Sequence, residues 1–134
     1  MSPRVPALPR PTDAELDILA VLWRLEQGTV REIHELLGRF DDAQTGYTTT
    51  LKLLQIMFSK GLVRRDDSER AHVYAATLTK QQTREHLLGD LTRRAFEDSP
   101  ALLALQALGS TKRARPEELA QIKALLDLLE QKGK

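Results

Sequence analysis

Two capping boxes mark the starts of short helices near the beginning of this chain. Residues 12–15 (TDAE) and 29–32 (TVRE) each place a threonine three residues before a glutamate, so that the two side chains can satisfy free N–H groups at a helix start. Apolar residues follow each box at helical spacing, and Gly28 and Gly38 are the expected helix ends. A third helix is expected from about Tyr47 to Lys60. These patterns predict three short, closely spaced helices.

A β-hairpin is predicted directly after Gly61. Residues 62–65 and 70–75 are typical of strands, and the polar run of residues 66–69 joins them as a hairpin tip. Three short helices followed by a hairpin is the element order of a winged helix-turn-helix. We therefore expect a winged-helix DNA-binding domain over residues 12–78.

The rest of the chain divides into an arm and a helical region. Residues 1–11 are rich in proline and are expected to form a disordered N-terminal arm. From residue 79 the pattern is that of long helices, with new starts at Ser99 and Pro116. The predicted fold class is mainly α with a small β-hairpin, in which an N-terminal winged helix-turn-helix precedes a C-terminal helical dimerisation segment over residues 79–134.

Leucine spacing in the helical region predicts a dimer interface. The last predicted helix carries apolar residues at steps of three, four and three, a two-heptad seam that lacks a partner in the same chain. The helix before it is too apolar to be solvated alone. Folding back onto the N-terminal domain is the alternative, but a symmetric dimer is the commoner solution. The residues expected at the interface are Leu102, Leu105, Leu108, Leu119, Ile122, Leu126 and Leu129.

The third predicted helix has a polar face suited to reading DNA. On a helical wheel this face lies apart from an apolar side formed by Tyr47, Leu51, Leu54, Met57 and Phe58. Gln can bond adenine in a bidentate manner, Thr offers a hydroxyl or a methyl group, and Lys reaches guanine or phosphate. Any amphipathic surface helix has two such faces, but the basic flanks of the following hairpin favour DNA. The residues expected to contact DNA are Thr48, Thr49, Lys52, Gln55, Arg64, Arg65 and Arg70.

The overall charge of the chain does not favour DNA binding, so any attraction to DNA must come from a local basic patch. The chain carries a net charge of +1, with ten basic and eleven acidic residues in positions 1–78 and ten and eight in positions 79–134. The hairpin tip holds Asp66, Asp67 and Glu69, which phosphates would repel unless these side chains point away. Modest affinity per monomer is therefore expected, together with a need for a dimer.

Other classes of function find no support. The chain has no cysteine, which excludes a disulfide framework, a thiolate metal site and a cysteine nucleophile. No nucleophile elbow, phosphate loop or HExxH motif occurs, and His34, His72 and His86 fall in different predicted elements. We expect no enzyme activity, no metal and no cofactor. Neither a secretory signal nor a membrane-spanning apolar run is found, so a cytoplasmic location away from the membrane is expected.

Several motifs, in order, resemble the BlaI/MecI family of penicillinase repressors. They are TDAELDILAVLW (12–23), TVREIHELL (29–37), YTTTLKLLQ (47–55), KGLV (60–63) and the second strand of the hairpin (70–74). The similarity covers roughly residues 12–130 and is most specific in the first half. It implies a winged-helix repressor that dimerises through its C-terminal helices and binds a short inverted repeat upstream of the genes it controls.

The resemblance also bears on the reading residues. In relatives these come from the start of the recognition helix, at positions that match Thr48, Thr49, Leu51 and Lys52. Leu51 stands where some members have a basic residue, and Ile56 stands where arginine is frequent. Both departures remove possible contacts to DNA.

Two regulatory mechanisms of the family can be compared with the chain. In antibiotic-responsive members a membrane sensor-protease pathway leads to cleavage of an Asn-Phe bond in the dimerisation helices. The matching stretch, residues 102–108, contains neither Asn nor Phe, so this possible upstream partner has no support. The cysteine motif of copper-responsive members is absent, which excludes that mechanism.

The expected function is that of a homodimeric, sequence-specific repressor that binds double-stranded operator DNA and excludes polymerase sterically. The alternative is a winged-helix protein-interaction module without specific DNA binding, because the fold alone does not fix function. The near-neutral N-terminal domain keeps this alternative open.

Overall fold

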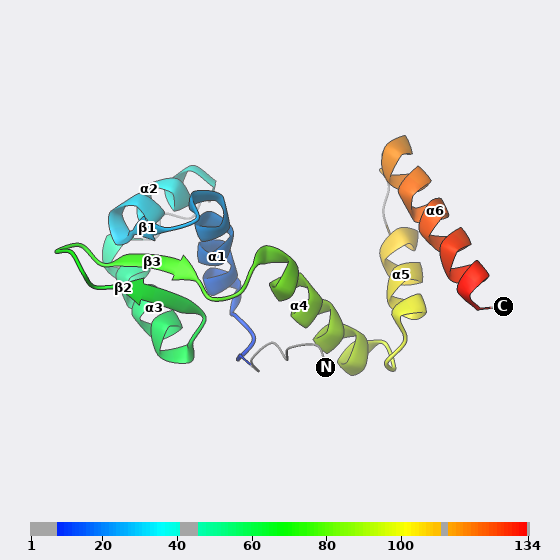
Figure 1. The fold of residues 1–134 in the computed structure, drawn as a ribbon, viewed down its shortest axis with the longest axis horizontal. Coiled ribbons are helices and arrows are strands. Elements are labelled where there is room, and N and C mark those ends of the chain that lie inside the picture. The colour runs from blue at the N-terminus through cyan, green and yellow to red at the C-terminus, as the bar shows by residue number, and fades with distance from the viewer. Residues whose placement is uncertain (1–7, 41–45, 111–112, 134) are drawn as a thin grey trace. The chain divides into compact units, whose positions relative to one another are not determined.

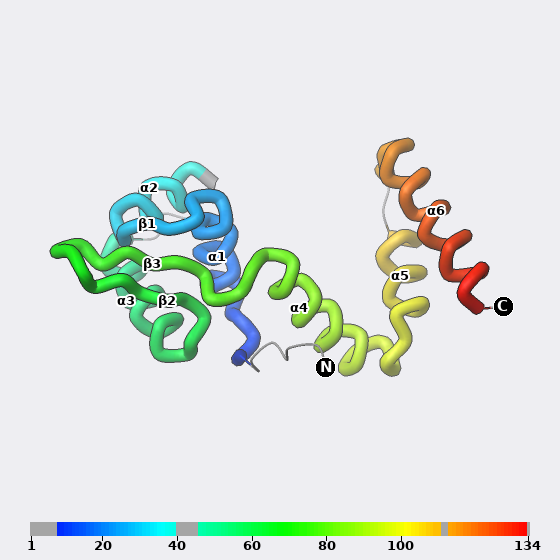
Figure 2. Tube along the Cα trace, in the orientation of Figure 1, coloured from blue at the N-terminus to red at the C-terminus, as the bar shows by residue number. Residues whose placement is uncertain are grey.

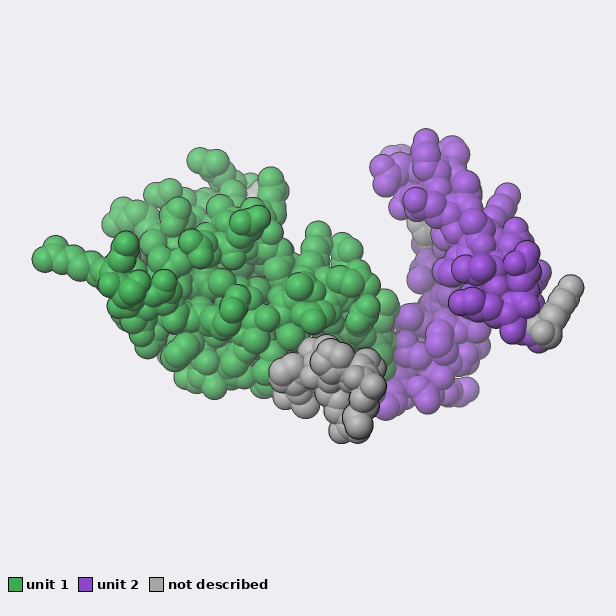
Figure 3. Space-filling model, in the orientation of Figure 1, with its two compact units in different colours: residues 1–89 green, residues 90–134 purple. Residues whose placement is uncertain are grey.

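The computed structural model describes residues 8–40, 46–110 and 113–133 (Figure 1). Its elements are α1 (Asp13–Leu25), β1 (Gly28–Thr29), α2 (Val30–Phe40), α3 (Tyr47–Lys60), β2 (Val63–Asp66), β3 (Val73–Ala76), α4 (Lys80–Ala95), α5 (Pro100–Gly109) and α6 (Pro116–Lys132). The chain forms two compact units, residues 1–89 and 90–134 (Figure 3). The boundary between the two units falls inside α4, so residues 80–89 of this helix belong with the unit that contains the sheet.

The predicted helix starts are confirmed. In α1, the backbone N–H of Thr12 donates to Oε1 of Glu15 (2.9 Å), and the N–H of Glu15 donates to Oγ1 of Thr12 (3.2 Å). Thr29 and Glu32 make the same two bonds at 2.9 and 3.2 Å in front of α2. Each box satisfies two N–H groups that would otherwise lack a helical partner.

The predicted helix ends are only partly confirmed. Gly61 ends α3 in the left-handed conformation (φ +84°), and its N–H donates to the carbonyl of Phe58 at 3.1 Å. Gly38, in contrast, does not end α2, which continues to Phe40. A glycine inside a helix costs only about 1 kcal/mol relative to alanine, and the burial of neighbouring Leu37 is large enough to offset that cost.

The sheet has three antiparallel strands in the order β1–β3–β2 (Figure 2). The hairpin of β2 and β3 was predicted; β2 has the expected length but begins one residue later, and β3 is shorter than expected, with four residues instead of six. The two-residue strand β1 was not predicted; it pairs Gly28 with Tyr74 and Thr29 with Val73. This third strand joins the start of α2 to the hairpin. With three helices and a three-stranded sheet, the mainly helical fold with an N-terminal winged helix is confirmed.

The core of the first unit lies between α1, α2, α3 and the sheet. It is built from Ile18, Leu19, Val21, Leu22, Val30, Ile33, Leu37, Leu54, Met57, Leu62, Val63 and Tyr74. Of the predicted N-terminal arm, residues 1–7 lie outside the described residues, and Leu8 is half-buried against this core. Residues 41–45, between α2 and α3, are also outside the described residues.

The buried face of α3 differs from the predicted one. Leu54 and Met57 are fully buried as expected, but Tyr47 and Phe58 are 45% and 39% exposed. The third buried position is Thr50, one helical turn before Leu54. A buried threonine is tolerated here because its hydroxyl lies 3.1 Å from Nδ1 of His34 and 3.4 Å from a backbone carbonyl.

The second unit exposes most of its leucines. Ser99 caps α5 by accepting the N–H of Leu102 at 3.2 Å, as predicted. Among the described residues of α5 and α6 none is buried. The exposed large apolar side chains of these two helices are Leu102, Leu105, Leu108, Leu119, Leu125, Leu126, Leu128 and Leu129.

Candidate nucleic-acid interface

The exposed face of α3 carries the four predicted reading residues. Thr48 and Thr49 lie in its first turn, and Lys52 and Gln55 follow one and two turns later. All four side chains are exposed. The structure thus brings these predicted residues together on one helix.

Among the described residues, no side chain caps the N-terminus of α3. Its N-cap is Gly46, which supplies no side-chain cap, and the first turn contains no acidic residue. The unpaired N–H groups and the positive end of the helix dipole therefore meet no carboxylate from the helix itself. A phosphate oxygen is the kind of group that such a helix end accepts.

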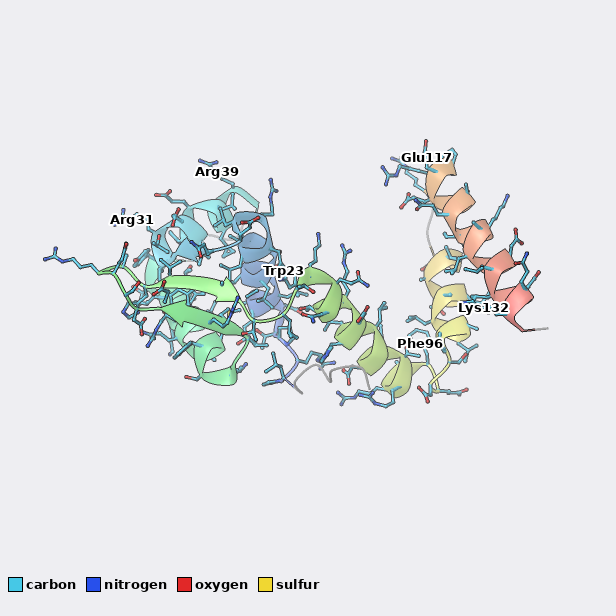
Figure 4. All side chains as sticks on the ribbon, in the orientation of Figure 1. Trp23, Arg31, Arg39, Phe96, Glu117 and Lys132 are labelled. Carbon is cyan, nitrogen blue, oxygen red and sulfur yellow. The ribbon has the colours of Figure 1, made fainter. Side chains whose placement is uncertain are left out.

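The start of α3 is held in place by α2. Nδ1 of His34 lies 3.1 Å from Oγ1 of Thr50, and the ring of His34 meets the ring of Tyr47 edge to face at 5.6 Å. These contacts fix the turn that carries Thr48 and Thr49. Two further basic residues, Arg31 and Arg39, extend from α2 (Figure 4).

The end of α3 is held by α1 through an ion pair between a half-buried lysine and a buried glutamate. Nζ of Lys60 lies 2.9 and 3.1 Å from the two carboxylate oxygens of Glu15, the same glutamate that closes the α1 capping box. Burial alone would raise the pKa of Glu15, but the backbone bond from Thr12 and the contacts with Lys60 together lower it below its usual value. Both ends of α3 are therefore fixed by polar contacts to its neighbours.

Arg65 of the wing lies beside the reading helix. Its guanidinium is 4.2 Å from the ring centroid of Phe58 on α3, a cation–π contact, and its Nε is 2.8 Å from Oδ1 of Asp67. The second contact is an ion pair whose N–H is not well directed for a hydrogen bond. The Asp67 carboxylate raises the pKa of Arg65. Arg65 is thus near the interface but already engaged within the wing.

Arg64 lies on the other face of the sheet. It pairs across the hairpin with Ala75, whereas Arg65 pairs with Tyr74, and successive strand residues point to opposite faces. Arg64 lines a pocket beside Trp23 of α1, and no ion pair holds it in the described part of the chain. The structure therefore does not group Arg64 with the α3 residues.

The acidic wing tip is partly neutralised. Oδ1 of Asp66 accepts the N–H of Ser68 at 2.9 Å, and contacts with Ser68 lower the pKa of Asp66. Asp67 faces Arg65 and lies 3.5 Å from Nδ1 of His72. Arg70 is exposed in the turn between the strands. Two of the three tip carboxylates thus have partners within the wing, which reduces their repulsion of a nearby phosphate.

The sequence of this chain matches a known protein family. The family model described as penicillinase repressor matches residues 11–128 of this chain. The chain belongs to the penicillinase repressor family. Similar curated proteins are the "Transcriptional regulator BlaI" of Mycobacterium tuberculosis strains CDC 1551 / Oshkosh and ATCC 25618 / H37Rv, each 37% identical over 93 residues. The match covers 69% of this chain and 65% of each relative.

A solved structure is also similar to this member of the penicillinase repressor family. It is described as the solution structure of the DNA-binding domain of the repressor BlaI. The superposition has a TM-score of 0.48 and 21% sequence identity, and it covers 57% of this chain and 90% of the other.

The penicillinase repressor fold here uses residues that the sequence patterns did not single out as functional. Phe58 was expected in the core but is a platform for Arg65, and His34 contacts Thr50 and Tyr47 at the start of α3. No short-range sequence pattern predicted either contact, because the two partners come from different elements in each case. Lys60 and Glu15 are 45 residues apart in sequence, so their pairing was equally out of reach.

Over residues 8–40, 46–110 and 113–133, no group of three or more His, Asp or Glu side chains is arranged to hold a metal ion. The helices of the same residues include none that is both long and apolar enough to cross a membrane.

Proposed function

We propose that this chain is a sequence-specific DNA-binding repressor that acts as a homodimer on an inverted-repeat operator. The observation that carries the proposal is the exposed polar face of α3, whose first turn holds no acidic residue, in a member of the penicillinase repressor family. Bound across a promoter, such a dimer represses by excluding polymerase. No catalytic chemistry is involved.

The side chains of α3 divide the work of recognition. Gln55 has the amide geometry for adenine, and Lys52 can reach guanine O6 and N7 or a phosphate. Thr48 and Thr49 sit in the turn of a recognition helix that meets base edges. Backbone contacts come from the wing, where Arg70 is the exposed candidate and Arg65 is prealigned on Phe58. Arg64 serves a phosphate only if DNA extends over the opposite face of the wing.

The exposed leucines of α5 and α6 support the homodimer. An isolated protomer would leave eight large apolar side chains of these helices in water, which is unusual for a stable monomer. A two-fold axis places two reading helices about 34 Å apart, one turn of B-DNA. The second half-site contact then becomes intramolecular and raises the overall affinity.

Fluorescence anisotropy with the DNA upstream of the chain's own gene tests recognition by α3. Lys52→Ala is expected to weaken specific binding by roughly tenfold or more, the usual worth of one base contact. The matched control is Lys132→Ala, which removes the same charge from the last turn of α6. Operator affinity that is unchanged in Lys52→Ala, or equally weakened in both variants, contradicts the assignment of α3 as the reading helix.

Sedimentation velocity tests the dimer independently. The protomer has a mass of 15.1 kDa, so the expected species is about 30 kDa. Leu126→Asp is expected to yield monomers and to weaken operator binding at the same time, whereas Ala124→Asp, on the opposite side of α6, should leave both unchanged. A Leu126→Asp variant that stays dimeric excludes this seam.

Exposed apolar side chains on α3 favour the second candidate, a protein-interaction module. Tyr47, Ile56 and Phe58 are each more than a third exposed, and aromatic side chains are enriched at protein–protein interfaces. Binding to DNA without preference for any genomic sequence, at low and at moderate salt, would favour this alternative. Specific binding that weakens steeply with salt would exclude it.

A further inference from the structure

The first compact unit contains an open pocket that the proposed DNA interface does not use. Its volume is about 410 Å³, and it lies between the end of α1, the β2–β3 hairpin and the start of α4. The lining residues that matter are Trp23, Glu26, Arg64, Ala75, Leu78 and Lys80. Figure 4 labels Trp23 on α1, beside the start of α4. The volume falls within the range of small-molecule sites.

One wall of the pocket is apolar and held in place. The indole Nε1–H of Trp23 donates to the carbonyl of Leu78 at 3.0 Å, so the single polar atom of this ring is satisfied. The rest of the indole, together with Leu78 and Ala75, forms an apolar surface. Such a surface suits a compact hydrocarbon or aromatic group.

The rim of the pocket carries uncompensated positive charge. Arg64 and Lys80 both line it, both are exposed, and neither has an ion-pair partner among the residues that the structure describes. Lys80 is also the first residue of α4, whose first turn has no acidic residue, so a cation stands at the positive end of the helix dipole. Glu26 is the one carboxylate of the lining, which leaves the pocket with a net positive charge.

We propose that this pocket binds a small organic anion, with its carboxylate between Arg64 and Lys80 and its apolar body against Trp23 and Leu78. An anion there supplies the negative charge that both cations and the start of α4 lack. The apolar body excludes water from the same contacts and strengthens them. The site is separate from the exposed face of α3, so binding of the anion requires no DNA.

Nuclear magnetic resonance of the full chain gives a direct test, because Trp23 is the sole tryptophan and yields a single indole N–H signal. The probe is phenylacetate, and its matched control is neutral phenylacetamide. Phenylacetate is expected to shift the indole signal saturably, with a Kd on the order of 1 mM for a ligand of this size. Phenylacetamide is expected to bind at least about tenfold more weakly, because it lacks the charge.

Substitutions identify the charges responsible. The double variant Arg64→Gln, Lys80→Gln is expected to weaken phenylacetate binding by about tenfold, whereas Lys132→Gln should leave it unchanged. The same spectra show whether each variant is folded. Equal shifts from acid and amide, no saturable shift, or full binding by the folded double variant would each overturn the proposal. Because the measurement contains no DNA, a negative result leaves the repressor proposal intact.

Discussion

The ion pair between Lys60 and Glu15 makes a strong prediction about stability. It joins the last turn of α3 to the first turn of α1, and the Glu15 side chain is only 2% exposed while that of Lys60 is 32% exposed. Lys60→Met removes the ammonium group and keeps most of the apolar stem. The carboxylate of Glu15 then stays buried with only its Thr12 contacts, so the first unit should be less stable.

The size of the loss follows from the burial of the two partners. Removing one member of a fully buried pair costs about 3–5 kcal/mol, and exposed pairs contribute about 0–1 kcal/mol. Because Lys60 is partly solvated, an intermediate loss of about 2 kcal/mol is expected. For a unit of this size, that loss corresponds to a fall in Tm of roughly 10 °C.

The effect should depend on pH in a definite direction. The pKa of Glu15 is lowered in the folded state from its ordinary value of 4.5, so its contribution is complete above pH 4.5 and is lost as pH falls through the lower folded value. Lys60→Met raises the folded pKa of Glu15, because burial is then less opposed. The difference in stability between wild type and variant should therefore be large near neutral pH and shrink below about pH 4.

Urea unfolding followed by Trp23 fluorescence measures this loss in the first unit, because Trp23 is the sole tryptophan and packs against that core. Lys52→Met is the matched control, since Lys52 is exposed on the same helix; it should change the free energy of unfolding by less than about 0.5 kcal/mol. The stabilising role of the pair would be refuted if the free energy of unfolding of Lys60→Met lay within about 0.5 kcal/mol of the wild-type value, or if the loss of stability did not change with pH.

Two further predictions concern the backbone of the winged helix. Gly61→Ala should lower the free energy of unfolding by about 1–2 kcal/mol, because Gly61 has φ +84° and a Cβ there would lie 3.3 Å from a methyl group of Leu8. Gly38→Ala lies inside α2 with no described atom within 4 Å of the added Cβ, so it should instead raise the free energy of unfolding by about 0.5–1 kcal/mol. Urea titrations in which both substitutions change the free energy of unfolding in the same direction would contradict this. Thr29→Ala should cost about 1 kcal/mol by removing the α2 cap, and a thermal melt unchanged by it would show that the cap is dispensable.

Local signals in the sequence predicted the helix starts and the hairpin. A capping box needs only four consecutive residues, so Thr12 with Glu15 and Thr29 with Glu32 identified α1 and α2 without knowledge of the fold. Gly61 identified the end of α3 for a similar reason, since the left-handed closing residue of a helix favours glycine.

Strand β1 and the buried face of α3 depend on tertiary contacts, so they could not be predicted from local sequence patterns. The strand β1 has two residues and exists only because β3 lies beside it, so no alternation of its own could predict it. The wheel for α3 assigned Tyr47 and Phe58 to the core, but the helix is rotated so that Thr50 is buried instead. The polar reading face was still predicted, because its four residues are exposed in either rotation.

We expect the charge of the first unit to make DNA binding by α3 dependent on dimerisation at the α6 seam. Positions 1–89 carry twelve basic and twelve acidic residues and so have no net charge, and Arg65, Asp66 and Asp67 have partners within the wing. A single unit can therefore neutralise few phosphates. Each phosphate contact that is missing reduces the steepness of the plot of log affinity against log salt concentration by about 0.9. Two units on one operator double that slope and bind the second half-site at high effective concentration. On the proposed function, separating the protomers at the α6 seam should thus reduce operator binding more than removing Lys52 does.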